Sequence, residues 1–218
     1  MKKKRIVFLV GISLLLGAML MSACRNSTRP SAVIVTKSYW INNLKGILVS
    51  DKIIIYCTNQ EKPDSIKISG PKNMVDNLEI EKSLNGTLNI SLKRGDRFDC
   101  KSGDEYIKIW ISQPNISTFT AMKNAQIYSY NFFSKKKISS EVYSSAIIYF
   151  DTLKANSIEF NAYTNGKIFC DELSAKSLEI KAFTESEIIV SGKTEMANIT
   201  ANSAFIDSKG LITGNNLN

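Results

Sequence analysis

Two aspartates are the residues of this chain whose type and spacing could most directly do chemistry. Asp151 and Asp171 lie 20 residues apart, at the same place in a repeated stretch of sequence. Two carboxylates stacked one repeat apart could hold Ca²⁺ or act as an acid and a base on a polysaccharide. They could equally be two solvated turn residues. Glu159 and Glu179 form a second acidic pair with the same spacing and the same two interpretations.

Nucleophilic and metal chemistry has little support in the other residues. The chain contains no histidine, which removes the commonest general base and every Ser-His or Cys-His pair. Beyond Cys24, the cysteines Cys57, Cys100 and Cys170 show no CxxC and no metal-site spacing. An oxidising compartment permits a disulfide, and Cys57 with Cys100 is the predicted pairing because both fall in one segment. We expect a buried Cys170, no catalytic residue, no metal and no cofactor.

Aromatic residues form two further columns when the repeats are aligned. Met122, Tyr143, Tyr163 and Phe183 align in one column, and Tyr149, Phe169 and Ile189 align in the other. If the alternation of each strand buries Ile148 and Ile168, both columns face outward. An outward aromatic ladder could contact a polysaccharide or a partner protein. The alternatives are that the stacked rings only stabilise neighbouring repeats, or that corner residues break the alternation. The predicted binding residues are Tyr143, Tyr163, Phe183, Tyr149 and Phe169.

These columns come from a repeat of about 20 residues in the region 118–218. The position held by Ile138 recurs as Ile158, Leu178 and Ile199, and the residues around it alternate as strands do. This period predicts a short parallel β-solenoid, one coil per repeat, with Ile158, Phe160 and Ala162 pointing inward. A small-residue column at Ala125, Ala146, Gly166 and Ser186 indicates a tight corner.

Residues 33–117 alternate with period two but do not repeat. Ile53, Ile55 and Cys57 share one face of an expected strand, and Asn85-Gly86 is typical of a two-residue hairpin turn. The predicted fold class is therefore all-β, with an antiparallel or mixed β region over 33–117 that continues into the solenoid.

The N-terminal sequence predicts an anchor. A basic start, an apolar run from Ile6 to Leu20 and Met21-Ser22-Ala23-Cys24 together resemble a bacterial lipobox. We expect a signal peptide over 1–23, a diacylated Cys24 and a flexible polar tether over 24–32. A membrane reached through this lipid is then one partner. The residue after Cys24 is Arg25 rather than aspartate, which favours an outer-membrane lipoprotein of the cell envelope, on its periplasmic or surface face.

The charge balance gives little information on further partners. Four of the 28 basic residues lie in the predicted signal peptide and none of the 20 acidic ones, which leaves 24 basic residues and a formal charge of +4. This surplus is not clustered into a stripe, so no nucleic acid is expected as a partner.

Four stretches resemble a known family in their order. They are Leu44–Ser50 (LKGILVS), Ile66–Asn73 (IKISGPKN), Leu88–Leu92 (LNISL) and Ile107–Ile116 (IKIWISQPNI). Together with the repeat they resemble the bacterial lipoproteins named "putative auto-transporter adhesin, head GIN domain", from about Tyr39 onward. Members usually carry Gly-Ser-Gly in each coil, where this chain has Ser144-Ser145-Ala146, Thr164-Asn165-Gly166 and Thr184-Glu185-Ser186. The family name is an analogy from fold, and fold alone does not confer function.

The sequence thus favours a lipid-anchored, non-enzymatic binding module of adhesin type, with polysaccharide or an envelope protein as its partner. The alternatives are a carbohydrate-active β-helix enzyme that uses Asp151 and Asp171, and a structural component of an envelope complex.

Overall fold

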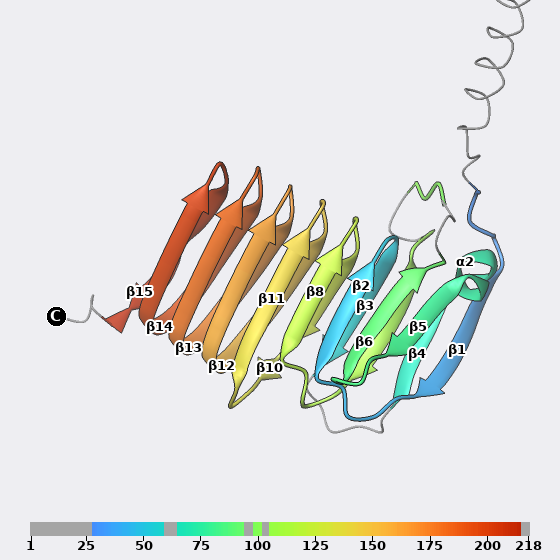
Figure 1. Cartoon of the computed structure of the whole chain (residues 1–218), viewed down its shortest axis with the longest axis horizontal. Coiled ribbons are helices and arrows are strands. Elements are labelled where there is room, and N and C mark those ends of the chain that lie inside the picture. The colour runs from blue at the N-terminus through green and yellow to red at the C-terminus, as the bar shows by residue number, and fades with distance from the viewer. Residues whose placement is uncertain (1–27, 59–64, 94–97, 102–104, 215–218) are drawn as a thin grey trace, which may run out of the picture.

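The computed structural model describes residues 28–58, 65–93, 98–101 and 105–214, and Figure 1 shows them as one elongated stack of strands. The predicted signal peptide, Cys24 and the tether before Thr28 lie outside the described residues. The elements in chain order are β1 (Ile34–Trp40), β2 (Gly46–Ser50), β3 (Ile53–Thr58), β4 (Ser65–Pro71), α2 (Lys72–Asp76), β5 (Leu78–Lys82), β6 (Thr87–Leu92), β7 (Ile107–Ser112), β8 (Thr118–Met122), β9 (Gln126–Tyr130), β10 (Phe132–Phe133), β11 (Lys137–Tyr143), β12 (Ile147–Tyr163), β13 (Lys167–Phe183), β14 (Glu187–Asn202) and β15 (Phe205–Thr213).

The predicted β-solenoid is confirmed. β12, β13 and β14 stack in parallel, so that Ile148, Ile168 and Ile188 lie in one column along the stack. Each of these long strands bends around a coil with two broad sides and one short side. Inward residues are buried as the alternation predicts, among them Ile158 and Phe160, neither of which is exposed. The fold is held by a continuous apolar interior, because each coil covers the one before it.

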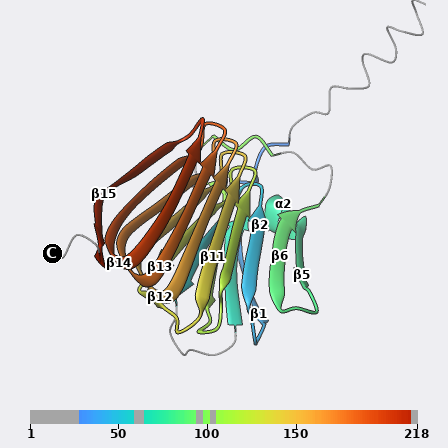
Figure 2. The same ribbon diagram turned by 60° about the vertical axis from the view of Figure 1, so that its left-hand side comes forward.

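The two broad sides are named here face A and face B. Face A contains β5, β6, β2, β8, β11 and the second parts of β12–β14, in that order along the stack. Face B contains β1, β4, β7, β3, β9 and the first parts of β12–β14, followed by the start of β15. In Figure 2 the strands of face A lie side by side along the stack.

The N-terminal region is a mixed sheet that continues the same stack, as predicted, but its coils are out of sequence order. β2 and β3 form the coil next to β8 and β9. The later pair β6 and β7 adds to the other side of that coil, also in parallel. β4 and β5 then close this end by antiparallel pairing with β7 and β6, and β1 pairs with β4.

Sharp turns join face A to face B between β2 and β3, between β8 and β9, and in the coils that follow. In four of these turns two consecutive residues adopt positive φ, as at Ser144 (φ 53°) and Ser145 (φ 63°) or Thr184 (φ 54°) and Glu185 (φ 58°). Two positive φ values in a row are typical of a type I′ turn. The following small residue is buried, as at Ala146, whose backbone N–H donates to the carbonyl of Tyr143 at 3.2 Å. The predicted corner column therefore lies directly after the turn, where the space is tight.

The two ends of the stack are finished differently. At the N-terminal end α2 lies over the interior and buries Met74 and Val75. At the other end the last coil leaves its inward residue Ile199 41% exposed, and no described residue covers it. Among the described residues no helix is long and apolar enough to cross a membrane.

Candidate functional site

A column of aromatic side chains crosses face B and joins five neighbouring strands. Parallel pairing places Trp110 beside Tyr56, Tyr56 beside Tyr128, Tyr128 beside Tyr149, and Tyr149 beside Phe169. We call these five residues the face B ladder. They come from β7, β3, β9, β12 and β13, so the ladder joins the N-terminal region to the regular solenoid.

The ring geometry follows from the stacking of the strands. Centroids are 5.6 Å apart for Tyr56 and Trp110, 5.7 Å for Tyr56 and Tyr128, and 6.0 Å for Tyr128 and Tyr149. The first two pairs are nearly parallel, at 23° and 22°. Strands in a sheet are about 4.8 Å apart, so rings at equivalent positions contact one another and form offset stacks.

A shorter ladder lies on face A beside the sharp turns. Tyr143 and Tyr163 stack at 4.9 Å with an interplanar angle of 8°, and Tyr163 and Phe183 stack at 5.4 Å and 9°. At these distances the ring faces lie against each other and only the ring edges point to solvent. These contacts correspond to the interpretation that stacked rings stabilise neighbouring coils, as do the contacts of Tyr56 in the face B ladder.

One tyrosine hydroxyl in each ladder donates a hydrogen bond to a carboxylate. Tyr149 donates to Asp171, and this hydrogen bond, with smaller contributions from burial and nearby charge, raises the pKa of Tyr149 to about 12. Tyr143 donates to Glu141 at 3.0 Å, and burial together with this bond raises the pKa of Tyr143 to about 12. Both phenols therefore stay protonated at neutral pH and act as hydrogen-bond donors.

The two aspartates considered for catalysis have structural partners. Asp151 accepts hydrogen bonds from the backbone N–H groups of Asn131, at 2.7 Å, and Thr152. Asp171 accepts the bond from Tyr149. Asp151 thus holds the corner of the preceding coil, and Asp171 fixes a ring of the ladder. These contacts favour the interpretation that the two aspartates are turn residues over the interpretation that they act as a catalytic acid and base.

The second acidic pair is neutralised by lysines. Lys137 Nζ lies 2.6 Å from Glu159, and Lys181 Nζ lies 2.6 Å from Glu179. Hydrogen bonds from Lys137 and Asn161 hold the pKa of Glu159 below its usual value. Within the part of the chain that the structure describes, no group of three metal-ligating residues gathers into a possible metal site.

The predicted Cys57–Cys100 disulfide is wrong for this structure, in which both thiols are free. Cys57 points into the interior from β3, and burial raises its pKa to about 12. Cys100 lies in the segment between β6 and β7, where its sulfur contacts Met74 Sδ at 4.0 Å. The two thiols belong to the same region of sequence but lie apart in the structure, because Cys57 is in the interior and Cys100 is near the helix that caps the stack. Cys170 is buried, as expected, and burial raises its pKa.

The structure divides the predicted binding residues between two surfaces. Tyr149 and Phe169 lie on face B, whereas the other three form the face A ladder. Sequence reasoning missed Tyr56, Trp110 and Tyr128, which make up most of the face B ladder. Alternation with the buried Ile55 could have placed Tyr56 outward, but no fixed repeat connects it to Tyr149.

One end of the face B ladder is the most accessible. Trp110 is 39% exposed, and Lys67 on the neighbouring strand β4 places its Nζ 5.5 Å from the Trp110 ring centroid. A lysine over an aromatic face is attracted to the ring electrons. The exposed Tyr130 lies two residues beyond Tyr128 on the same side of β9. The ladder therefore presents an amphipathic surface of rings, hydroxyls and one cation.

These features define a class of protein, an all-β solenoid with ordered outward side chains and a capped N-terminal end. The chain belongs to the family described as "Putative auto-transporter adhesin, head GIN domain", whose model matches residues 43–216. The predicted family resemblance is thereby confirmed. No curated protein matches the chain.

Two crystal structures share the fold at low sequence identity. A "putative adhesin" from Bacteroides fragilis has a TM-score of 0.61 and 14% identity over 86% of this chain and 99% of its own. A "putative lipid binding protein" from Parabacteroides distasonis has a TM-score of 0.52 and 13% identity, again over 86% of this chain and 99% of its own. At these identities the similarity concerns the fold.

Proposed function

We propose that this chain is a lipid-anchored protein of the bacterial cell envelope that binds a partner without catalysis, in the manner of an adhesin. Three observations support this proposal. The family description and the Bacteroides fragilis relative both point to adhesion. The sequence around Cys24 has the pattern of a lipoprotein signal. The carboxylates that could have formed a catalytic pair are engaged in corner and ladder contacts.

The face B ladder is the single observation that carries the binding role. It crosses five successive coils of a rigid sheet, so its side chains are ordered before any partner arrives. Ordered side chains lose little conformational entropy on binding. Tyrosine and tryptophan are also the residues most enriched among those that dominate interface energies. A surface of this kind provides affinity without requiring a deep cavity.

The ring orientation favours a protein over a polysaccharide as the partner. A sugar ring that packs on an aromatic side chain needs a free ring face. In this ladder Tyr56 stacks between Trp110 and Tyr128, so both of its faces are covered. The exposed edges and hydroxyls suit the apolar and hydrogen-bonding groups of a protein surface. The partner of this proposal is therefore an envelope or host-surface protein.

The test uses the soluble chain that starts at Arg25 and two kinds of pretreated cell-envelope fragments. Binding should survive periodate oxidation of sugars and disappear after protease treatment. Replacing Tyr56 and Tyr128 with threonine, a good strand residue, should weaken binding at least about tenfold, as expected for loss of two aromatic anchors. Replacing Tyr163 with threonine on face A is the matched control and should leave binding unchanged.

Two results would overturn this proposal. Binding that resists protease but is lost after periodate would make the partner a polysaccharide. Glycan cleavage that disappears in the Asp151→Asn, Asp171→Asn double variant would make the protein an enzyme.

A further inference from the structure

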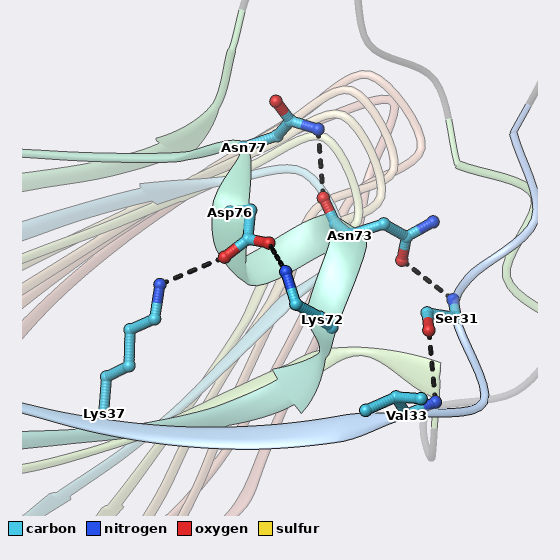
Figure 3. A network of polar contacts seen from close by, with 7 residues as sticks. All are labelled: Ser31, Val33, Lys37, Lys72, Asn73, Asp76 and Asn77. Atoms are coloured by element: carbon cyan, nitrogen blue, oxygen red, sulfur yellow. Dashed lines mark hydrogen bonds and ion pairs between the residues drawn. The ribbon is translucent and has the colours of Figure 1, made fainter.

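The segment that leads from the proposed anchor is fixed to the capped end of the stack. Ser31 N–H donates to Asn73 Oδ1 at 2.8 Å, and Asn73 Nδ2 donates to the carbonyl of Arg29 at 2.9 Å. Lys72 N–H donates to the carbonyl of Val33 at 2.8 Å. Figure 3 shows Ser31 and Val33 beside the helix α2 that carries Asn73 and Lys72. The described part of the predicted flexible tether is therefore held against the cap.

The attachment begins even earlier in the chain. Thr28 forms a parallel bridge with Phe98, and its carbonyl accepts a hydrogen bond from the N–H of Asp99 at 3.1 Å. Residues 25–27 alone separate Thr28 from Cys24. Four extended residues span at most about 14 Å. A diacylated Cys24 would thus hold the N-terminal end of the solenoid close to the bilayer surface.

That end exposes large apolar side chains at two corners. Val33 and Ile34 are each 58% exposed at the start of β1, next to the attached segment. Trp40 is 79% exposed at the other end of β1, beside the exposed Tyr39. Leu84 is fully exposed in the β5–β6 turn. We call these five residues the end patch.

Contacts between loops place Leu84 at the same corner as Trp40. Lys82 Nζ donates to the carbonyl of Asn42 at 2.7 Å, and Lys45 N–H donates to the carbonyl of Gly86 at 2.9 Å. These bonds join the β5–β6 turn to the loop that follows Trp40. The end patch therefore borders the terminal edges of both faces, because β1 ends face B and β5 ends face A.

The position of the anchor distinguishes this end from the other one. The C-terminal end also exposes apolar residues, including Met196 and Phe205. It lies a full length of the stack from β1, as Figure 1 shows. Because Thr28 lies within about 14 Å of the lipid, the end of the stack that carries the end patch is nearer to the membrane than the C-terminal end. Tryptophan and tyrosine favour the headgroup region of a bilayer, where an apolar ring and a polar group are both accommodated.

We propose that the end patch is a membrane-contact surface, seated in the headgroup region of the bilayer that holds the acylated Cys24. This inference rests on the proposed lipid anchor. A protein held by one acylated residue alone can tilt relative to the membrane. A second contact at the end patch fixes this tilt and so gives the molecule an orientation. The solenoid axis then points away from the membrane and leaves the face B ladder accessible.

Fluorescence quenching by brominated lipid tests this orientation, since the chain has two tryptophans, Trp40 and Trp110. The lipidated full-length Trp110→Phe variant carries Trp40 as its one tryptophan, and the Trp40→Phe variant carries Trp110. Each is reconstituted in phosphatidylethanolamine–phosphatidylglycerol vesicles with or without brominated phosphatidylcholine. We expect brominated lipid to remove the larger part of the Trp40 emission and to leave the Trp110 emission unchanged.

Fatty-acid labelling of Cys24, with Cys24→Ser as the negative control, separates the two proposals. Labelled protein whose Trp40 emission is unaffected by brominated lipid would overturn the orientation and leave the anchor standing. Quenching of Trp110 would also overturn it, because face B would then lie on the bilayer. Absence of label would refute the anchor, and the inference would fall with it.

Discussion

The two regions of the stack use the same coil but assemble it in different ways. In residues 118–213 each coil stacks on the one before it, so stacked residues such as Ile148 and Ile168 lie 20 positions apart. In residues 33–117 the coil of β6 and β7 is added to the outer side of the earlier β2 and β3. The regular solenoid is therefore built on an N-terminal region whose coils are stacked out of sequence order.

The cost of this stacking order is entropic, and its benefit is a closed end. Strand β2 pairs with β8 through Gly46 and Thr118, which are 72 positions apart in the chain. Closing a loop of this length costs conformational entropy. In return the chain delivers β4, α2 and β5 to the end of the stack. The helix α2 then covers the interior at this end, and the two faces end at the antiparallel strands β1 and β5.

The largest predicted effect concerns the junction between the two regions. Phe119 on β8 packs edge-on against Phe132 and Phe150, at 5.2 and 5.4 Å between ring centroids. Phe119→Ala should lower the free energy of unfolding by about 3–5 kcal/mol, as expected for a large buried cavity. Urea unfolding followed by circular dichroism measures this change. Separate transitions for the two regions in the parent protein would show that they are not one cooperative unit.

A second prediction compares the two ends. Met74→Ala in α2 should cost about 2–5 kcal/mol, because Met74 is fully buried under the cap. Ile199→Ala in the last coil should cost about 1 kcal/mol or less, because this side chain is already partly in water. The same unfolding measurement applies to both variants. Equal losses would contradict an open C-terminal end.

A smaller effect is predicted at the sharp turns of the regular region. Thr184 has φ 54°, a conformation that costs a residue with a Cβ roughly 1–2 kcal/mol. Thr184→Gly removes this strain but adds about 0.5–1 kcal/mol of backbone entropy, so it should stabilise the protein by about 0.5–1 kcal/mol. Thr120→Gly, within strand β8, is the matched control and should destabilise it. A lower thermal midpoint for Thr184→Gly would argue against the turn geometry.

The smallest predicted effect is at Tyr149 in the face B ladder. Tyr149→Phe removes the hydrogen bond to Asp171 and should cost at most about 1 kcal/mol at pH 8, because the pair is largely exposed. The folded-state pKa of Tyr149 is about 12, above its ordinary value of 10.0. The contribution is therefore complete below pH 10 and is lost as the pH rises from 10 towards 12. Unfolding midpoints of both proteins should converge over that range, and a constant difference would exclude the bond.

Sequence patterns predicted the solenoid well because its signals are local. A strand alternates inward and outward residues whatever its neighbours are, which gave the burial of Phe160. Where coils stack in sequence order, equivalent residues of neighbouring coils are separated by a fixed number of positions, which predicted the column of Ile158 and Leu178. The candidate site was predicted in part. Tyr149 and Phe169 obey this interval, whereas Trp110 and Tyr56 are joined to them by a stacking order that no interval encodes.

The sequence by itself determined the coil period, the inward face of each strand and the position of the sharp turns, since these depend on neighbouring residues along the chain. The tertiary structure alone decided the order of the first coils, and with it the five-ring ladder on face B. It also placed Cys100 by the cap, away from Cys57. The physical reason is that pairing between distant strands is selected by how the whole stack closes its interior, and closure is a property of all the coils together.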